Sequence, residues 1–399
     1  MKIVTFGCRI NTYESALIQQ TLGEMPGLII VNTCAVTAEA ERQCRQTIRR
    51  LKKENPSHRI IVTGCAAQLH PEVYAAMPEV DRVLGNREKL DKASLLAADP
   101  MMVGDIEHTP FSIPVVTDFD GRTRAFIQVQ QGCDHACTFC VVHAVRGHNK
   151  GVPVEQVLCQ MRTLMAKGYQ EFVVTGIDVT SYPYGFSALI ECILTELPDI
   201  RRLRLGSLDP KGVDDHLIDL FGRYPALLGH MHLSVQAGDN LILKRMGRRH
   251  TREDVLALVQ KLRTVRPDMV FGADLIAGFP TETPEQFEQT MALVREAELT
   301  LLHVFPFSVR PGTPSAKMPM VPVADRKKRA EQLRALGKAR LATYLKEQVG
   351  QTDTVLIEED GQGFNTHYIK TKLTTTAAPG TIVRVRNKGT EGDELVAET

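Results

Sequence analysis

Three cysteines that lie close together in the sequence are the clearest candidates for chemistry. Cys133, Cys137 and Cys140 have the spacing Cys-x3-Cys-x2-Cys and follow a short apolar strand. Three thiolates in one loop suit an iron–sulfur cluster, whereas a structural zinc site wants four ligands and usually presents them as two pairs. Three ligands on a four-iron cluster leave one iron open, where a substrate can bind. The alternatives are a zinc site completed by His135 or His143, or three unrelated cysteines.

A second set of three cysteines is spread over the first 65 residues. Cys8, Cys34 and Cys65 each follow a predicted strand, in the segments TFGC, VNTC and VTGC. Because the carboxyl ends of neighbouring parallel strands meet at one edge of a sheet, these thiols should converge. Gly7 and Gly64 precede two of them, and glycine lets the backbone turn sharply towards a bound group. We predict a second cluster with three protein ligands; the alternative is three small apolar side chains at strand ends.

The composition sets the class of protein. Nine cysteines in 399 residues, an odd number, argue against a disulfide framework and for metal-binding or catalytic thiols in a cytoplasmic protein. Cys44, Cys159 and Cys192 fall in predicted helices, and we interpret them as buried inert thiols. No apolar run approaches the roughly 18 residues of a membrane span. Lys and Arg total 48 against 47 Asp and Glu, so a nucleic acid would have to be held by local patches.

Three segments must position these residues. Residues 1–118 alternate strands with helices, which predicts a parallel α/β sandwich whose strands lead to the three distant cysteines. Residues 119–345 contain six strand–helix units in series, which predicts a partial (β/α)6 TIM-like barrel with functional groups just after the strands. Residues 346–399 contain short β-like runs separated by Gly, Pro and Asn, which predicts a small antiparallel β-barrel suited to binding.

The Cys-x3-Cys-x2-Cys loop after a first barrel strand resembles that of the radical S-adenosylmethionine (SAM) superfamily. The resemblance implies that Cys133, Cys137 and Cys140 are the catalytic ligands and that the open iron binds the amino and carboxylate groups of SAM. Reductive cleavage of SAM in that family yields a 5′-deoxyadenosyl radical. The reduction needs a water-poor site, and Phe139, beside the ligands, would help to exclude water.

Two three-cysteine sites in this order resemble the methylthiotransferases, and the resemblance covers essentially the whole chain. The segments GCRINTYES (7–15), VVTGIDVTSY (173–182) and LHVFPFSVRPGTP (302–314) are most similar to the bacterial branch that acts on threonylcarbamoyladenosine in tRNA. The branch that acts on isopentenyladenosine usually has Gln-Met where this chain has Arg9-Ile10. The resemblance implies two [4Fe-4S] clusters and a C-terminal TRAM module, a small β-barrel that binds RNA.

Polar residues at the ends of the barrel strands are candidates for contacts with SAM. Gly176 follows the second strand and could let the amino group of SAM approach the backbone, although a tight turn explains a glycine there equally well. Ser207 and Asp209 follow the third strand, and Ser234 and Gln236 lie at the fourth. Polar groups at barrel strand ends suit the ribose and methionine portions of SAM.

The resemblance implies a tRNA methylthiotransferase that replaces the C2 hydrogen of N6-threonylcarbamoyladenosine-37, beside the anticodon, with a methylthio group. Its partners would be the tRNA anticodon stem-loop, a flavodoxin-like or ferredoxin-like electron donor and a sulfur source. The threonyl carboxylate would be bound best by an arginine, whose planar guanidinium matches a carboxylate. Arg310 and Arg146 are the candidates for substrate binding. The alternatives are the same reaction on isopentenyladenosine-37 or on an aspartate of a ribosomal protein, and, from another class, a two-cluster iron–sulfur electron-transfer protein.

Two basic stretches bear on RNA binding. The third segment has basic residues with Phe364 and Tyr368 interleaved, the usual composition of an RNA-binding β-barrel. Its basic residues are Lys370, Lys372, Arg384, Arg386 and Lys388. The stretch KRMGRRH (244–250) is interpreted as a solvated helix face.

Overall fold

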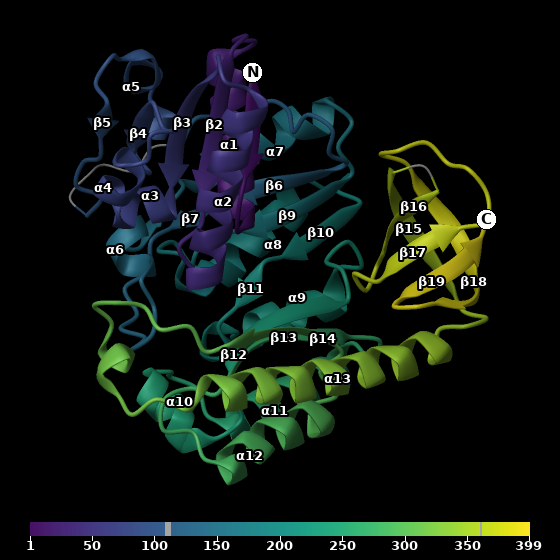
Figure 1. Ribbon diagram of the computed structural model, residues 1–399. Coiled ribbons are helices and arrows are strands. Elements are labelled where there is room, and N and C mark those ends of the chain that lie inside the picture. Colours follow the sequence, from purple (N-terminus) through teal and green to yellow (C-terminus); the bar gives the residue numbers. More distant parts are fainter. Residues whose placement is uncertain (108–112, 360) are drawn as a thin grey trace.

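The computed structural model describes residues 1–107, 113–359 and 361–399. Three units follow one another along the chain (Figure 1): a parallel α/β unit, a β/α unit with two neighbouring parallel sheets, and a closed β-barrel. The yellow C-terminal barrel flanks the middle unit in Figure 1. This architecture confirms the predicted α/β fold class.

A five-stranded parallel sheet forms the first unit, with the strands in sequence order. Its strands are β1 (Lys2–Thr5), β2 (Leu28–Thr33), β3 (Arg59–Gly64), β4 (Arg82–Leu84) and β5 (Met101–Met102). Its helices are α1 (Arg9–Leu22), α2 (Ala38–Glu54), α3 (Cys65–Leu69), α4 (Pro71–Ala75), a 3₁₀ helix (Glu88–Leu90) and α5 (Lys92–Leu96). Ile48 of α2 packs with Ile29 on one face, and Ile18 of α1 packs with Ile30 on the other. Burial on both faces explains the continuous apolar strands.

Six β/α units in series form the middle unit. Its barrel strands are β6 (Arg124–Gln128), β9 (Glu171–Thr175), β10 (Arg202–Leu205), β11 (Ser207–Leu208), β12 (His230–Gln236), β13 (Val270–Ala277) and β14 (Leu301–Pro306). They pair in parallel in the orders β10-β9-β6 and β11-β12-β13-β14, and only Gly206 separates β10 from β11. The strands therefore form the predicted partial (β/α)6 barrel.

Helices connect the strands of the middle unit. They are α6 (Val142–Arg146), α7 (Val154–Ala166), α8 (Phe186–Glu196), α9 (Asp215–Arg223), α10 (Asn240–Met246), α11 (Arg252–Val265), α12 (Pro284–Glu296) and α13 (Val323–Glu347), with 3₁₀ helices at Val179–Ser181, Pro210–Gly212 and Pro314–Lys317. A short ribbon of β7 (Gln130–Gln131) and β8 (Lys150–Gly151) frames the loop between β6 and α7. Among the described residues, no helix has both the length and the apolar character needed to cross a membrane.

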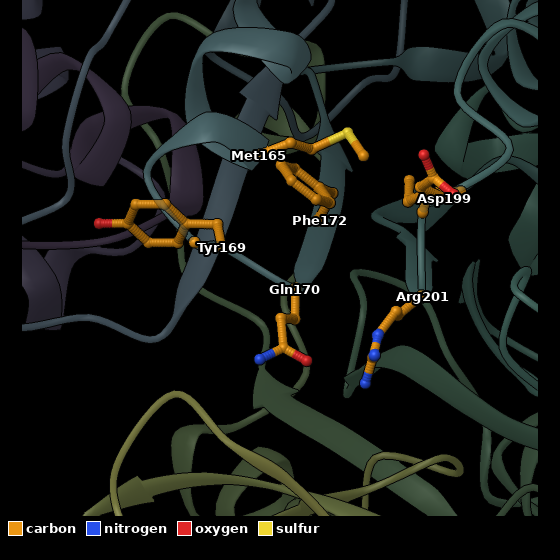
Figure 2. Close-up of a pocket in the computed structure, with 8 residues that line it drawn as sticks. Met165, Tyr169, Gln170, Phe172, Asp199 and Arg201 are labelled. Atoms are coloured by element: carbon orange, nitrogen blue, oxygen red, sulfur yellow. The ribbon is translucent and has the colours of Figure 1, made fainter.

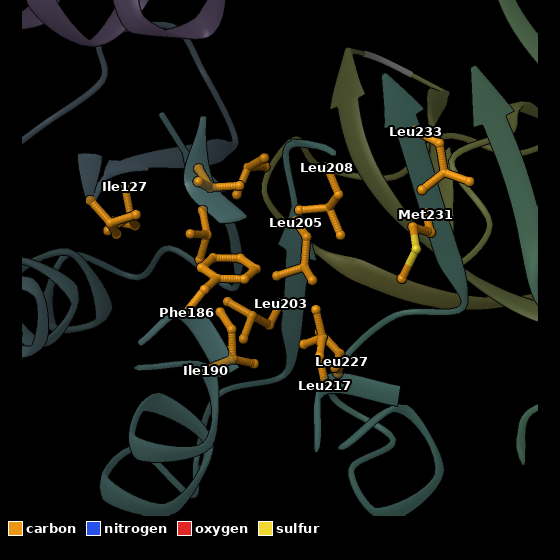
Figure 3. Close-up of a cluster of buried hydrophobic side chains, with 14 of the residues drawn as sticks. Ile127, Phe186, Ile190, Leu203, Leu205, Leu208, Leu217, Leu227, Met231 and Leu233 are labelled. Atoms are coloured by element: carbon orange, nitrogen blue, oxygen red, sulfur yellow. The ribbon is translucent and has the colours of Figure 1, made fainter. Parts of the chain in front are cut away.

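Alternation along β10 gives the barrel an apolar outside and a charged inside. Leu203 and Leu205 pack in the cluster under α8 and α9 (Figure 3). Arg202 and Arg204 alternate with them and so point to the other side of the strand, into the lumen. Glu171 on β9 pairs with both, at 2.9 Å from Arg202 and 2.7 Å from Arg204. One buried carboxylate thus holds two buried arginines.

The C-terminal unit is a closed five-stranded barrel. Its strands are β15 (Thr352–Glu359), β16 (Gln362–Asn365), β17 (Lys370–Leu373), β18 (Ile382–Glu391) and β19 (Glu394–Glu398), in the order β15-β16-β17-β19-β18. The pairings are antiparallel as predicted, except that β17 and β19 run parallel. The sequence did not indicate this exception, because register and direction depend on the long connection between β17 and β18.

This barrel docks on the N-terminal ends of the middle strands. Arg202 donates to the carbonyl oxygen of Thr354 at 2.7 Å, and Arg204 donates to that of Asn365 at 2.5 Å. Tyr368 stacks on His230, with ring centroids 5.2 Å apart. These contacts close that end of the barrel lumen with the turn between β16 and β17.

The docked position of the C-terminal barrel contradicts the expectation that its aromatic rings bind RNA. Phe364 and Tyr368 were expected to lie on a nucleic-acid-binding face, but Arg124 lies over both rings, at 4.7 and 5.2 Å from their centroids. Both rings therefore pack against the middle unit. The spacing of residues along a strand could not reveal this, because it does not show which face of a small barrel docks.

Replacing Glu171 with Gln should destabilise the protein, since Arg202 and Arg204 would keep buried charges with no carboxylate. Breaking a buried pair in this way typically costs about 3–5 kcal/mol. The free energy of unfolding in urea measures the effect. Glu191→Gln is the matched control: Glu191 pairs with Arg223 at the surface and should leave the unfolding midpoint nearly unchanged. Equal effects of the two substitutions would contradict the role of Glu171.

Candidate active site

The loop with Cys133, Cys137 and Cys140 runs from β7 to α6, at the carboxyl ends of the barrel strands. The Thr138 amide donates to the carbonyl of Met246 at 2.9 Å, and the Cys140 amide donates to that of Cys137 at 3.1 Å. Burial raises the pKa of Cys133 to about 12. Such a sulfur keeps its proton unless a metal ion stabilises the thiolate, so this donor set fits a metal cluster.

The three cysteines line a cavity of about 140 Å³. Four of the five residues predicted to bind SAM also line it: Ser207, Asp209, Ser234 and Gln236. The fold thus brings together residues that lie more than 100 positions apart in the sequence. His135, a candidate zinc ligand, lies at 2.7 Å from Asp178 and is engaged by that carboxylate.

Gly176 does not line this cavity. A Cβ on it would lie 2.8 Å from Oε1 of Gln130. The same oxygen accepts hydrogen bonds from the amides of Ile177 and Asp178, at 2.9 and 2.8 Å. Close packing within the turn therefore explains why residue 176 is a glycine. This agrees with the alternative interpretation, in which Gly176 serves a tight turn and not SAM binding.

Arg248 joins the cysteine loop to the wall of the cavity. Its guanidinium lies 3.6 Å from Sγ of Cys137 and 3.2 Å from a carboxylate oxygen of Asp209, and it donates to the Ser234 carbonyl at 2.8 Å. Burial alone would raise the pKa of Asp209, but His250 and Arg248 hold it well below its usual value. Asp209 is therefore a buried, ionised group at this site.

The sequence interpretation missed Arg248 because it was assigned to a solvated helix. Gly247 ends α10 in a left-handed conformation with φ of 74°. Arg248 therefore lies in the loop beyond the helix and turns inwards. The sequence did contain one signal that the helix ends there: a glycine within the basic stretch, since glycine commonly ends a helix.

Aromatic side chains close one side of the cavity, as expected for Phe139. Its ring packs edge-on against Phe279 at 6.4 Å, and Phe279 packs against Phe307 at 5.4 Å. Phe279 is fully buried. This wall covers one side of the cavity, whereas Cys140 is exposed to solvent.

The second set of cysteines converges as predicted. Cys8, Cys34 and Cys65 follow the adjacent parallel strands β1, β2 and β3. A Cβ on Gly7 would lie 2.8 Å from the Cys34 sulfur, and one on Gly64 would lie 2.4 Å from the Thr33 backbone. Only glycine fits there, so the backbone approaches the sulfurs closely. Burial raises the pKa of Cys34 to about 12, and a metal would again be needed to ionise it.

The cysteines outside the two sets have mixed environments. Cys44 is buried in α2, close to Cys34, as expected. Cys192 is partly buried, and Cys159 is exposed on α7, so the prediction that all three are buried was wrong for Cys159. One face of α7 faces solvent, and the residue type alone did not show which.

A buried charge network lies beneath the second set. Glu14 pairs with Arg146 and, at 2.6 Å, with Lys89. Burial alone would raise the pKa of Glu14, but Arg146 and Lys89 hold it below its usual value. Burial lowers the pKa of Lys89, whereas Glu14 and the sulfur of Cys65 raise it. Two cations against one carboxylate leave positive charge beside the sulfurs, which fits thiolate ligands.

Neither arginine predicted to bind the substrate is free to do so. Arg146 is 2% exposed, pairs with Glu14 and donates through Nε to Cys65 Sγ at 3.2 Å. Arg310 is 3% exposed and pairs with Glu41 of α2. Both candidates are corrected on this ground: each guanidinium already neutralises a buried carboxylate. Arg146 instead joins the two cysteine sites, because it ends α6, which follows the first cysteine loop.

A second hollow, of about 310 Å³, lies at the opposite ends of the strands (Figure 2). Tyr169 and Gln170 precede β9, and Asp199 and Arg201 precede β10. Functional groups of β/α barrels lie at the carboxyl ends of the strands. This hollow is therefore on the side away from the cysteines.

Two family models match this chain. The one described as Radical SAM superfamily matches residues 127–294, and the one described as Uncharacterized protein family UPF0004 matches residues 1–85. Among solved structures, the radical SAM methyltransferase TsrM from Kitasatospora setae aligns with a TM-score of 0.54 at 17% identity, over 77% of this chain and 66% of that one. The radical SAM enzyme OxsB aligns with a TM-score of 0.51 at 14% identity, over 83% and 56%. These likenesses show the fold.

Curated relatives extend over nearly the whole chain. It is 47% identical to the threonylcarbamoyladenosine tRNA methylthiotransferase MtaB of Rickettsia prowazekii, over 98% of this chain and 95% of that protein. It is 36% identical to the protein of the same name in Thermotoga maritima, over 93% and 90%. It is 33% identical to a tRNA-2-methylthio-N(6)-dimethylallyladenosine synthase of Maricaulis maris, over 90% and 87%.

The site and the fold together define a radical SAM enzyme. Within that class, the chain belongs to the methylthiotransferase family. Membership implies SAM and a [4Fe-4S] cluster and excludes the alternative of an electron-transfer protein without a substrate. The three-cysteine loop has the donor set that this cluster needs.

Replacing Arg248 with Met should weaken SAM binding at least tenfold, because Asp209 would lose its buried cation and the Ser234 carbonyl its donor. Equilibrium dialysis of reconstituted protein with SAM measures this, and iron content should not change. Arg249→Met is the matched control: Arg249 also approaches Asp209, at 3.4 Å, but from the solvent, so its loss should matter less than threefold. Similar losses in both variants would contradict the role of Arg248.

Proposed function

We propose that this enzyme converts N6-threonylcarbamoyladenosine-37 of tRNA to its 2-methylthio derivative. One observation carries the proposal: the chain has two three-cysteine sites and is 47% identical, over 98% of its length, to a protein named for this reaction. Arg146 follows the first site and donates to Cys65 of the second. The same reaction on isopentenyladenosine is the rival, since relatives at 33% identity bear that name. The third candidate substrate, an aspartate of a ribosomal protein, does not occur in the name of any relative compared above.

At the first site, Cys133, Cys137 and Cys140 would hold the catalytic cluster. Ser207, Asp209, Ser234 and Gln236 line the cavity and would contact SAM, and Arg248 keeps Asp209 ionised and in place. When bound, the cluster and SAM supply the radical that a strong aromatic C–H bond requires. Phe139 and Phe279 shield one side of this site.

At the second site, Cys8, Cys34 and Cys65 hold an auxiliary [4Fe-4S] cluster that supplies or carries sulfur. The close approach of Gly7 to Cys34 and the positive charge of Arg146 and Lys89 support this assignment. The reaction also needs an electron donor of the flavodoxin or ferredoxin type and a sulfur source. One SAM would supply the methyl group and a second would supply the radical.

The C-terminal barrel is proposed to bind tRNA through its outer basic residues. Lys370, Lys372 and Lys388 are exposed, although each pairs with a glutamate. The aromatic rings take no part, because they pack against the middle unit. The proposed tRNA substrate supports the expected cytoplasmic location.

The two-cluster assignment predicts about eight irons per reconstituted chain. Changing Cys8, Cys34 and Cys65 together to Ala should halve the iron and stop methylthiolation while SAM cleavage continues. Changing Cys133, Cys137 and Cys140 to Ala should also halve the iron and should abolish SAM cleavage. Iron analysis and chromatography of 5′-deoxyadenosine provide the measurements. Unchanged iron after loss of Cys8, Cys34 and Cys65 would refute the auxiliary cluster.

The substrate assignment predicts a preference that can be measured directly. Wild-type enzyme should methylthiolate tRNA that carries threonylcarbamoyladenosine at least ten times faster than tRNA from cells unable to make the threonylcarbamoyl group. A buried charge-assisted contact is typically worth about 2–5 kcal/mol, which exceeds a tenfold effect. Mass spectrometry of digested nucleosides gives both rates. Equal rates would overturn the substrate, although not the chemistry.

A further inference from the structure

Arg9 lies between the two cysteine sites. It follows Cys8 directly, at the start of α1. Its side chain enters the barrel lumen: a Cβ on Gly206 would lie 3.9 Å from its Nη1, and its Nη2 lies 3.4 Å from the Tyr368 hydroxyl. Gly206 immediately precedes Ser207, which lines the cavity beside Cys133. The guanidinium therefore borders the site from the lumen side.

The other described arginines of the lumen each pair with a carboxylate. Arg202 and Arg204 share Glu171. Arg124 pairs with Glu358 at 2.5 Å. Arg9 forms no ion pair with any described carboxylate; its hydrogen bond to Tyr368 is long and neutral. It is half-buried, so part of its side chain remains accessible to an anion.

The potential around Arg9 is positive. Burial lowers the pKa of His230 far below its usual value, and Arg204 and Arg9 lower it further. Burial alone would raise the pKa of Tyr368, yet Arg9 and Arg124 hold it below its usual value. Asp274, on the neighbouring strand β13, lies between His232 and His303, at 3.1 and 3.2 Å. An anion is therefore favoured on the Arg9 side.

A second polar group on this side lacks a partner. His230 is 6% exposed, stacks on the Tyr368 ring that Arg9 also approaches, and has an Nε2 with no hydrogen-bond partner among the described residues. A buried nitrogen without a partner costs free energy. A neutral imidazole can donate one hydrogen bond to an oxygen of a bound group.

The covalent structure of the proposed substrate indicates where its carboxylate lies when C2 is at the cysteine site. In adenine, N1 is bonded to both C2 and C6, so a group on the N6 nitrogen lies on the same edge of the base as the C2 hydrogen. When C2 faces the cavity of Cys133, Cys137 and Cys140, the threonyl carboxylate must lie a few ångströms away, in the same lumen. Arg310 and Arg146 are held elsewhere by Glu41 and Glu14.

We propose that Arg9, assisted by His230, is the binding site for the threonyl carboxylate and thereby selects threonylcarbamoyladenosine over adenosines with uncharged N6 groups. The proposal rests on the proposed function. A guanidinium binds a carboxylate through two parallel hydrogen bonds. The position of Arg9 next to Cys8 holds the substrate between the two sites.

The test uses reconstituted full-length protein and two tRNAs, one with threonylcarbamoyladenosine-37 and one with isopentenyladenosine-37. Arg9→Gln should lower the rate on the first at least tenfold and leave the rate on the second within twofold, so that the preference collapses. Arg9→Lys should recover part of the preference, because it keeps the charge but not the planar fork. Iron content and SAM cleavage without tRNA should match wild type in both variants.

Arg124→Gln is the matched control, since Arg124 lies in the same lumen but is held by Glu358. It should leave the preference between the two tRNAs unchanged. An Arg9→Gln variant with a tenfold preference would overturn the assignment while the proposed function stands. The assignment of Arg9 would also be overturned if Arg124→Gln lost the preference between the two tRNAs as completely as Arg9→Gln. A wild-type enzyme without any preference would overturn the proposed substrate itself.

Discussion

Glu14 carries a buried negative charge between two cations, and this triad holds the first two units in a single arrangement. Glu14 and Lys89 belong to the first unit, whereas Arg146 comes from α6, directly after the loop of Cys133, Cys137 and Cys140. Loss of one partner leaves an uncompensated buried charge, which typically costs about 3–5 kcal/mol. The first cysteine loop is therefore tied to the edge of the sheet that carries Cys65.

A similar constraint acts at the other end of the barrel. Glu171 holds Arg202 and Arg204, and these arginines donate to backbone carbonyls of the C-terminal barrel. The docked barrel closes the N-terminal ends of the strands with Tyr368. The docked barrel fills the N-terminal end of the lumen. The open space therefore lies at the carboxyl ends of the strands, and the polar groups there face it. Among the described arginines of the lumen, Arg9 is the one without a carboxylate partner, and this favours an anion there.

Local patterns allowed much of the fold and both metal sites to be predicted. Strands at regular intervals before Cys8, Cys34 and Cys65 predict a parallel sheet, and the carboxyl ends of parallel strands meet at one edge. The same rule placed Ser207, Asp209, Ser234 and Gln236 at one cavity. Patterns failed where a side chain has a distant partner: Arg310 meets Glu41 across 269 positions, and Arg146 meets Glu14 across 132.

The sequence by itself therefore determined the order of the units, the cysteine sets and the strand ends at which chemistry occurs, because periodicity and spacing are local properties of the chain. Only the tertiary structure decided which arginines are free, that Arg248 turns towards Cys137, and that Phe364 and Tyr368 face the middle unit. Whether a charged or aromatic side chain serves binding or packing depends on its partners in space. A buried charge is neutralised by the carboxylate that the fold brings within about 3–4 Å, and sequence separation carries no information about that distance.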